Sequence, residues 1–115
     1  MNSAARSRLH DALRACRAIL DFVQGRTFEE YERSLLLRSA VERQFEIVGE
    51  ALRRAEIADG SVGTRVSQLR PIVGLRNRLI HGYDVVDQQL LWSIIRDEVP
   101  PLIAQLASVL AAAEA

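Results

Sequence analysis

The chain has 115 residues, which fits a single domain spanning residues 1–115, and with 49% hydrophobic but only 5% aromatic residues its core must come from Leu, Ile, Val and Ala. That composition favours packed helices over a β-sandwich, so we expect an all-α protein. Fifteen basic residues, all Arg, balance fifteen acidic ones, which excludes a strongly basic nucleic-acid binder and means that any anionic ligand must be held locally.

The first predicted helix covers about residues 3–23. Leu9, Leu13, Cys16 and Leu20 recur in it at spacings of three and four, the period of one helical face. Cys16 is the single cysteine, so an internal disulfide is excluded and we expect a buried thiol. The charged N-terminal segment, and the lack of any apolar run of about 18 residues, predict a cytoplasmic protein with no membrane span.

The second predicted helix begins at Thr27 and continues to about Ile57. Thr27 and Glu30 have the spacing of a capping box, and no Pro follows until much later in the chain. At 1.5 Å per residue this helix would be on the order of 45 Å long, so we expect part of it to contact a second subunit. Gly49 would permit close approach of another helix.

Two further helices are predicted after a loop at residues 59–64. Pro71 suits the first turn of a short third helix, and Gly82 can end it. Asp87 is a candidate N-cap for a fourth helix, which the prolines at 100–101 should bend or interrupt. The chain is therefore expected to form an up-and-down bundle of four to five helices with a long second helix.

The third helix and its exit concentrate the side chains that can carry chemistry. Within eight residues lie Arg76, Asn77, Arg78, His81 and Tyr83, and the only other histidine is His10. A histidine can exchange a proton near neutral pH, and two guanidinium groups can hold a phosphate and stabilise charge that develops on it. In RNA the adjacent 2′-hydroxyl is a built-in nucleophile, so this set could cleave RNA without a metal or cofactor.

The same residues also have a purely structural interpretation. Arg76 and Arg78 could be solvated or paired with nearby Glu, and His81 could cap a helix C-terminus, where the dipole favours imidazolium. Arg76 and His81 are five positions apart, roughly 140° round an ideal helix, so a shared site works best if the helix end is distorted. The spacing alone does not decide between the two interpretations, and no Cys/His cluster or Gly-rich phosphate loop offers another site.

The chain resembles the HEPN superfamily, and within it the DUF86 or HepT-like proteins. Their signature is Arg-x4-His-x-Tyr, which Arg76, His81 and Tyr83 match in order and spacing. Further similar segments are 37–52, which looks like the family's long second helix, and 72–83, 91–92 and 100–102, which look like its final half. The resemblance thus covers nearly the whole chain.

This resemblance implies a bacterial toxin of a toxin–antitoxin pair, a homodimer whose composite cleft cleaves RNA. Arg76 would steady the scissile phosphate and His81 would act as base or acid, with Asn77 and Arg78 in support. Tyr83 would receive AMP from a small nucleotidyltransferase that acts as the antitoxin. The alternatives are a non-catalytic subunit that docks a nucleotidyltransferase and holds nucleotide through Arg76 and Arg78, and a helical oligomerisation module without a ligand.

A few other positions bear on these expectations. Ser34 stands where relatives carry an acidic residue early in the second helix, and residues 66–69 stand where a Trp often precedes the motif. For Trp92 we expect packing in the core or an interface rather than base stacking. Interleaved arginines predict a solvated, salt-linked face for three acids spaced four apart, which are Glu42, Glu46 and Glu50.

Overall fold

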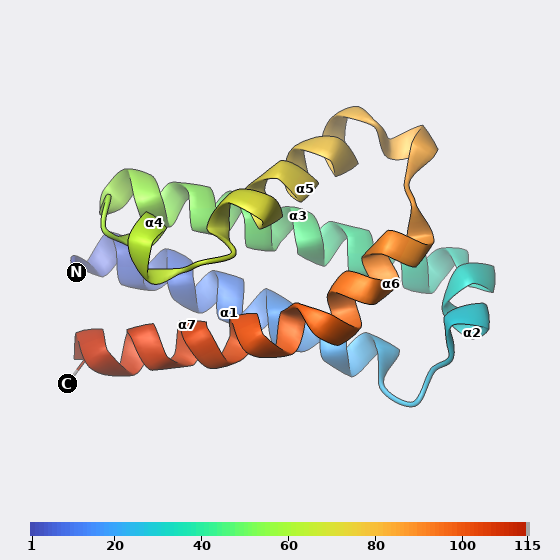
Figure 1. The fold of residues 1–115 in the computed structure, drawn as a ribbon, viewed down its shortest axis with the longest axis horizontal. Coiled ribbons are helices and arrows are strands. Elements are labelled where there is room, and N and C mark those ends of the chain that lie inside the picture. Colours follow the sequence, from blue (N-terminus) through green and yellow to red (C-terminus); the bar gives the residue numbers. More distant parts are fainter. Residues whose placement is uncertain (115) are drawn as a thin grey trace.

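Residues 1–114, the part of the chain that this computed structural model describes, fold into helices joined by short turns (Figure 1). The elements are α1 (Ser3–Val23), α2 (Phe28–Arg33), α3 (Leu35–Ala58), α4 (Val62–Arg65), α5 (Leu69–His81), the 3-10 turn η1 (Tyr83–Val85), α6 (Gln88–Asp97) and α7 (Val99–Glu114). Five of the helices in this part have ten or more residues, so the predicted all-α bundle is confirmed.

The core forms where α1 packs against α3 and α7, and where α3 packs in turn against α5. α1 runs against α3 along most of its length and against α7 on another side, while α5 packs on α3 (Figure 1). Cys16 is buried among these helices at 1% exposure, as expected, and burial raises the pKa of its thiol to about 12. The largest buried aliphatic side chains come from several helices and include Leu9, Ile19, Leu52, Leu69, Leu91, Leu102 and Leu106.

The predicted second helix is in fact two helices. Its start is confirmed, because the Thr27 hydroxyl accepts from the Glu30 N–H at 3.2 Å and the Glu30 carboxylate accepts from the Thr27 N–H at 3.0 Å. The prediction of one helix to Ile57 is wrong at Ser34, whose backbone is extended at φ −102° and ψ 103°. The Ser34 hydroxyl accepts from the Leu37 N–H at 3.1 Å and so begins α3, since serine satisfies a free helix-end donor well.

The connections around the motif follow their local sequence. Gly82 ends α5, and its N–H bonds to the Arg78 carbonyl at 2.7 Å. Asp87 caps α6 through the Leu90 N–H at 3.1 Å. The prolines at 100–101 lie in the first turn of α7, where their missing N–H groups are tolerated, and so α6 ends before them. The predicted loop at 59–64 is partly wrong, because it runs into the single turn of α4.

The α2–α6 contact is aromatic and polar. Trp92 is partly buried, with its ring centroid 5.2 Å from that of Tyr31 and 6.1 Å from that of Phe28, so the expected packing role is confirmed. The buried Tyr31 hydroxyl donates to Gln88 at 2.5 Å, and the Gln88 amide donates to Glu42 at 3.0 Å. This chain of bonds ties the start of α6 to α2 and α3. In residues 1–114 no helix combines the length and apolarity that a membrane crossing needs.

Candidate active site

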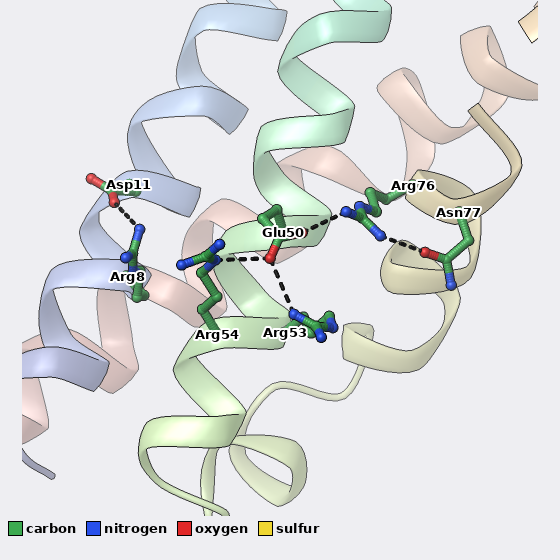
Figure 2. Close-up of polar contacts among 7 residues, drawn as sticks. All are labelled: Arg8, Asp11, Glu50, Arg53, Arg54, Arg76 and Asn77. Carbon is green, nitrogen blue, oxygen red and sulfur yellow. Dashed lines mark hydrogen bonds and ion pairs between the residues drawn. The ribbon is translucent and has the colours of Figure 1, made fainter. Parts of the chain in front are cut away.

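Arg76 lies on the face of α5 that packs against α3, and both of its terminal nitrogens are engaged. Its Nη2 donates to Oε2 of Glu50 at 2.6 Å, and its Nη1 donates to Oδ1 of Asn77 at 2.9 Å (Figure 2). The side chain is 23% exposed. Its Nε is buried and has no hydrogen-bond partner among residues 1–114. The guanidinium is therefore held in one orientation rather than free in solvent.

Close approach of α5 to α3 places Arg76 there, and Gly49 makes this approach possible. A Cβ built at Gly49 would lie 2.3 Å from Cβ of Arg76 and 3.2 Å from the carbonyl oxygen of Ile72. Real Cβ atoms essentially never show a contact as short as the first, and the second is tight, so a larger residue would force the helices apart. The predicted role of Gly49 in helix packing is confirmed.

Glu50 is the centre of a cluster of which the sequence predicted the pairs within α3 but not the link to Arg76. Oε1 of Glu50 accepts from Nε of Arg54 at 2.9 Å and from Nη1 of Arg53 at 3.2 Å, while Oε2 faces Arg76. The hydrogen bond from Arg54 and the charges of Arg76 and Arg53 lower the pKa of Glu50, against the opposing effect of partial burial. One carboxylate thus faces three guanidinium groups, and the cluster keeps a positive excess (Figure 2).

The expected salt-linked face of α3 is confirmed in most of its parts. Glu46 pairs with Arg43 at 3.5 Å and Glu50 with its neighbouring arginines, whereas Glu42 accepts from Gln88 instead. Glu50 and Arg76 are 26 positions apart, so no spacing rule along one helix connects them. The available signal was Gly49, because a close-approach glycine marks where another helix, and hence its side chains, must lie.

A cleft of about 490 Å³ runs between α1, α3 and α5, and Arg76 and Glu50 line it. Its other walls combine small apolar side chains such as Ala15, Ala51 and Ile47 with arginines from α1 and α3. These arginines, on the rim of the cleft, are Arg8, Arg14 and Arg43. Their ion pairs with carboxylates are long, at 3.5 to 3.8 Å, and exposed. Four arginines and three carboxylates, which are those of Asp11, Glu46 and Glu50, line the cleft, so its positive excess is small.

The other motif residues lie around the end of α5. Asn77, Arg78 and His81 line a second, mostly apolar cleft of about 420 Å³ between α5, η1 and α6. His81 is exposed and is the last residue of α5, in regular helical geometry. Arg78 is exposed too, and no ion pair links it to a carboxylate of residues 1–114. Tyr83 is 77% exposed on η1.

Within the single chain, Arg76 and His81 thus line different clefts. Asn77 stands between them, since it lines the cleft of His81 and accepts a hydrogen bond from Arg76. The helix-end distortion that would bring Arg76 and His81 to one face is not found, because α5 stays regular through His81. The described residues contain no group of three or more His, Cys, Asp or Glu side chains that could hold a metal ion.

An all-helical bundle with Arg-x4-His-x-Tyr at the exit of one helix has the features of a HEPN-type domain. The model of the family described as "Ribonuclease HepT-like" matches residues 12–109, and the chain belongs to this family. The match covers α3, α5 and the whole motif. The family assignment expected from the sequence is confirmed.

Named relatives agree with this assignment. A protein of Caldanaerobacter subterraneus subsp. tengcongensis named as a "putative RNase" is 30% identical over 102 residues, which cover 89% of this chain and 90% of the relative. A "putative RNase" of Methanocaldococcus jannaschii is 34% identical over 94 residues, covering 82% and 85%. A "probable ribonuclease HepT" of Thermococcus cleftensis is 28% identical over 102 residues, covering 89% and 92%. No solved structure is a significant match.

Proposed function

We propose that the protein is an endoribonuclease that needs no metal, with Arg76 and His81 as its catalytic residues. The observation that carries this proposal is the placement of the Arg76 guanidinium, which two hydrogen bonds hold in one orientation within a positively charged cluster. The exposed His81 lies on the same helix as Arg76. Arg76 binds the scissile phosphate and stabilises its developing charge, and His81 transfers a proton. Asn77 orients Arg76, and Arg78 adds a second phosphate contact. The family assignment and the names of its relatives support this activity.

The active unit is a homodimer, because one protomer does not bring Arg76 and His81 into the same cleft. Apolar side chains near the motif support a second copy covering it. Ile80 is 39% exposed, Val85 79% and Leu90 40%, so a contact between copies would remove them from water. A dimer would also place two motifs around one RNA strand.

RNA cleavage by the purified protein in EDTA tests the catalytic assignment. The wild type is expected to cut and to leave 2′,3′-cyclic phosphate ends, because the 2′-hydroxyl is the nucleophile. His81→Ala and Arg76→Ala should each lower the rate about 100-fold or more. His10→Ala is the matched control, since His10 lies on α1 and bonds to Glu114 at 2.7 Å, away from the motif. Unchanged cleavage by His81→Ala would contradict the proposal.

The activity belongs to the toxin of a cytoplasmic toxin–antitoxin pair, and a minimal nucleotidyltransferase blocks it by adding AMP to Tyr83. Support comes from the exposure of Tyr83, 77%, and from its place two residues beyond His81. An AMP group there adds bulk and negative charge where RNA phosphate would have to bind, so inhibition is both steric and electrostatic.

Co-expression with the neighbouring nucleotidyltransferase gene tests this control. Intact mass should rise by one or more AMP groups, and peptide mapping should place them on Tyr83 and not on the fully buried Tyr31, which serves as an internal control. Tyr83→Phe should stay unmodified and toxic. Unchanged mass together with no growth defect on expression of the gene alone would remove the toxin–antitoxin role.

A non-catalytic nucleotide- or partner-binding subunit is the second candidate. One observation favours it, because the pairing of Arg76 with Glu50 is what a structural role for Arg76 predicts. In that case the protein would co-purify with the nucleotidyltransferase and bind AMP through Arg76 and Arg78, but it would not cut RNA. Cleavage that depends on His81 would exclude it.

A further inference from the structure

We propose that Glu50 is a positioning residue for the guanidinium of Arg76, an inference that rests on the proposed function of Arg76 in binding phosphate. The two groups meet between α3 and α5 at 2.6 Å (Figure 2). Glu50 lines the same cleft as Arg76 and does not line the cleft of His81. Glu50 therefore acts on the reaction through Arg76.

The two hydrogen bonds of Arg76 orient its guanidinium and leave other N–H groups available to a ligand. Each terminal nitrogen of an arginine carries two N–H groups. Glu50 takes one N–H on Nη2 and Asn77 takes one on Nη1, so one N–H remains on each nitrogen. These remaining N–H groups can donate to phosphate oxygens. A guanidinium already oriented loses less conformational freedom when the phosphate arrives, which favours the bound geometry.

Glu50 is itself held by two arginines of its own helix. Arg53 and Arg54, one turn further along α3, bind its other oxygen at 3.2 and 2.9 Å. The carboxylate therefore stays fixed and cannot swing freely with Arg76. Because three guanidinium groups surround this one negative charge, the cluster remains attractive to a phosphate instead of being neutralised by Glu50.

The adjacent Gly49 makes the arrangement specific to this point of α3. It lets the Cβ of Arg76 come close to the α3 backbone, where Glu50 is the next residue. Two neighbouring positions thus have separate tasks: Gly49 gives room for the helix that carries Arg76, and Glu50 anchors its side chain. A carboxylate one turn earlier on α3, that of Glu46, pairs with Arg43 and makes no hydrogen bond or ion pair with Arg76.

That difference supplies a matched pair of variants, Glu50→Gln and Glu46→Gln. Both remove one charge from the same face of α3, and the two side chains are similarly exposed at 28% and 25%. The first measurement is NMR of the Arg76 side chain, which reports guanidinium rotation whether or not RNA is cut. We expect slow rotation in the wild type and in Glu46→Gln, and fast rotation in Glu50→Gln. Slow rotation in Glu50→Gln would overturn the inference.

Kinetics on RNA then separate positioning from general stability. Glu50→Gln is expected to lower kcat by about 10- to 100-fold, with a much smaller change in KM, because the phosphate contact is misplaced in the transition state. Glu50→Asp should recover part of kcat, and His10→Ala, whose side chain lines neither cleft, should keep the wild-type value. Thermal unfolding of each variant shows that it is folded. Full kcat in Glu50→Gln with a freely rotating Arg76 would also overturn the inference.

The two proposals fail in different ways. If the wild-type protein does not cut RNA, the nuclease assignment fails, and the NMR comparison still decides whether Glu50 holds Arg76. If the wild type cuts and Glu50→Gln cuts equally well, the nuclease assignment stands and the role of Glu50 is rejected.

Discussion

Arg76 shows how one residue can satisfy a structural and a functional interpretation together. Its ion pair with Glu50 is the contact expected of a structural arginine, yet it retains 23% exposure and lines an open cleft. Arg78, two positions later, is exposed and makes no ion pair in the described part of the chain. The motif thus offers one guanidinium held by two hydrogen bonds and one that is exposed to solvent.

Substitutions at two glycines test whether the position of Arg76 depends on the close approach of α5 to α3. Gly49→Ala should destabilise the protein by about 1–3 kcal/mol, because the new methyl group would overlap the Arg76 side chain and push α5 away. Gly74→Ala is the matched control, since a Cβ there meets nothing within 4 Å. It should stabilise the helix by about 0.5–1 kcal/mol. Urea unfolding measures both changes, and equal effects of the two substitutions would contradict the close-approach argument.

At the scale of elements, α5 is tied to α3 at its start and middle and left open at its end. At the start, Nη1 and Nη2 of Arg70 donate to the two carboxylate oxygens of Glu56 at 2.7 and 2.6 Å. In the middle, Arg76 bonds to Glu50. Beyond His81 the chain turns outward through η1, with Tyr83 in solvent. The helix is therefore fixed by ion pairs as far as Arg76, and its exit at His81 and Tyr83 is open to solvent.

The Glu56–Arg70 pair predicts a pH dependence of stability. The hydrogen bonds from Arg70 lower the pKa of Glu56 below its ordinary value of 4.5. The unfolded chain therefore binds a proton before the folded one does as pH falls, so the contribution is complete above about pH 4.5 and is lost as pH falls through the folded value. Arg70 is exposed and Glu56 is half-buried, so the effect of the pair is small and weakens with salt.

Urea unfolding of the wild type and Glu56→Gln at several pH values measures this contribution. The difference in unfolding free energy should be largest near neutral pH and should shrink as the medium is acidified below about pH 4.5. Glu32→Gln is the control, because Glu32 is exposed on α2 and the described residues show no ion pair for it. A difference that grows on acidification would contradict the assignment.

At the scale of the whole molecule, the apolar side chains that remain exposed are not confined to one place. Val85 is 79% exposed beside the motif exit, while Ile57 is 72% exposed near the end of α3, where the Asn2 amide donates to the Ala58 carbonyl at 2.8 Å. Only the first position adjoins the cleft lined by His81. In the proposed dimer the second copy therefore covers Val85, whereas Ile57 stays exposed to solvent.

Sedimentation of Val85→Arg and Ile57→Arg tests the dimer. The wild type and Ile57→Arg should sediment as dimers, and Val85→Arg should shift toward monomer and lose RNA cleavage, because a charge would be forced into an apolar contact. Both positions are exposed in the single chain, so neither substitution should affect its folding. A wild-type protein that is strictly monomeric would exclude the composite site.

Local sequence was enough to predict most helix boundaries. α1, the capping box at Thr27, the cap at Asp87 and the break before the prolines at 100–101 all depend on neighbouring residues and are present in the structure. The break at Ser34 was missed because the apolar stripe continues across it, and a serine fits both the interior of a helix and its start. The spacing of apolar side chains therefore did not predict the break between α2 and α3.

The sequence by itself determined the helical class, the caps and the family motif, since composition, periodicity and spacing are properties of neighbouring residues. Only the tertiary structure decided what surrounds the motif. It brought Glu50 to Arg76 across 26 positions, and it separated Arg76 and His81 into different clefts. The physical reason is that such contacts depend on how closely two helices pack and how they are rotated, and both follow from the whole core. The sequence thus shows that position 76 is an arginine in a family motif. The packing of α3 on α5 decides which residues it contacts.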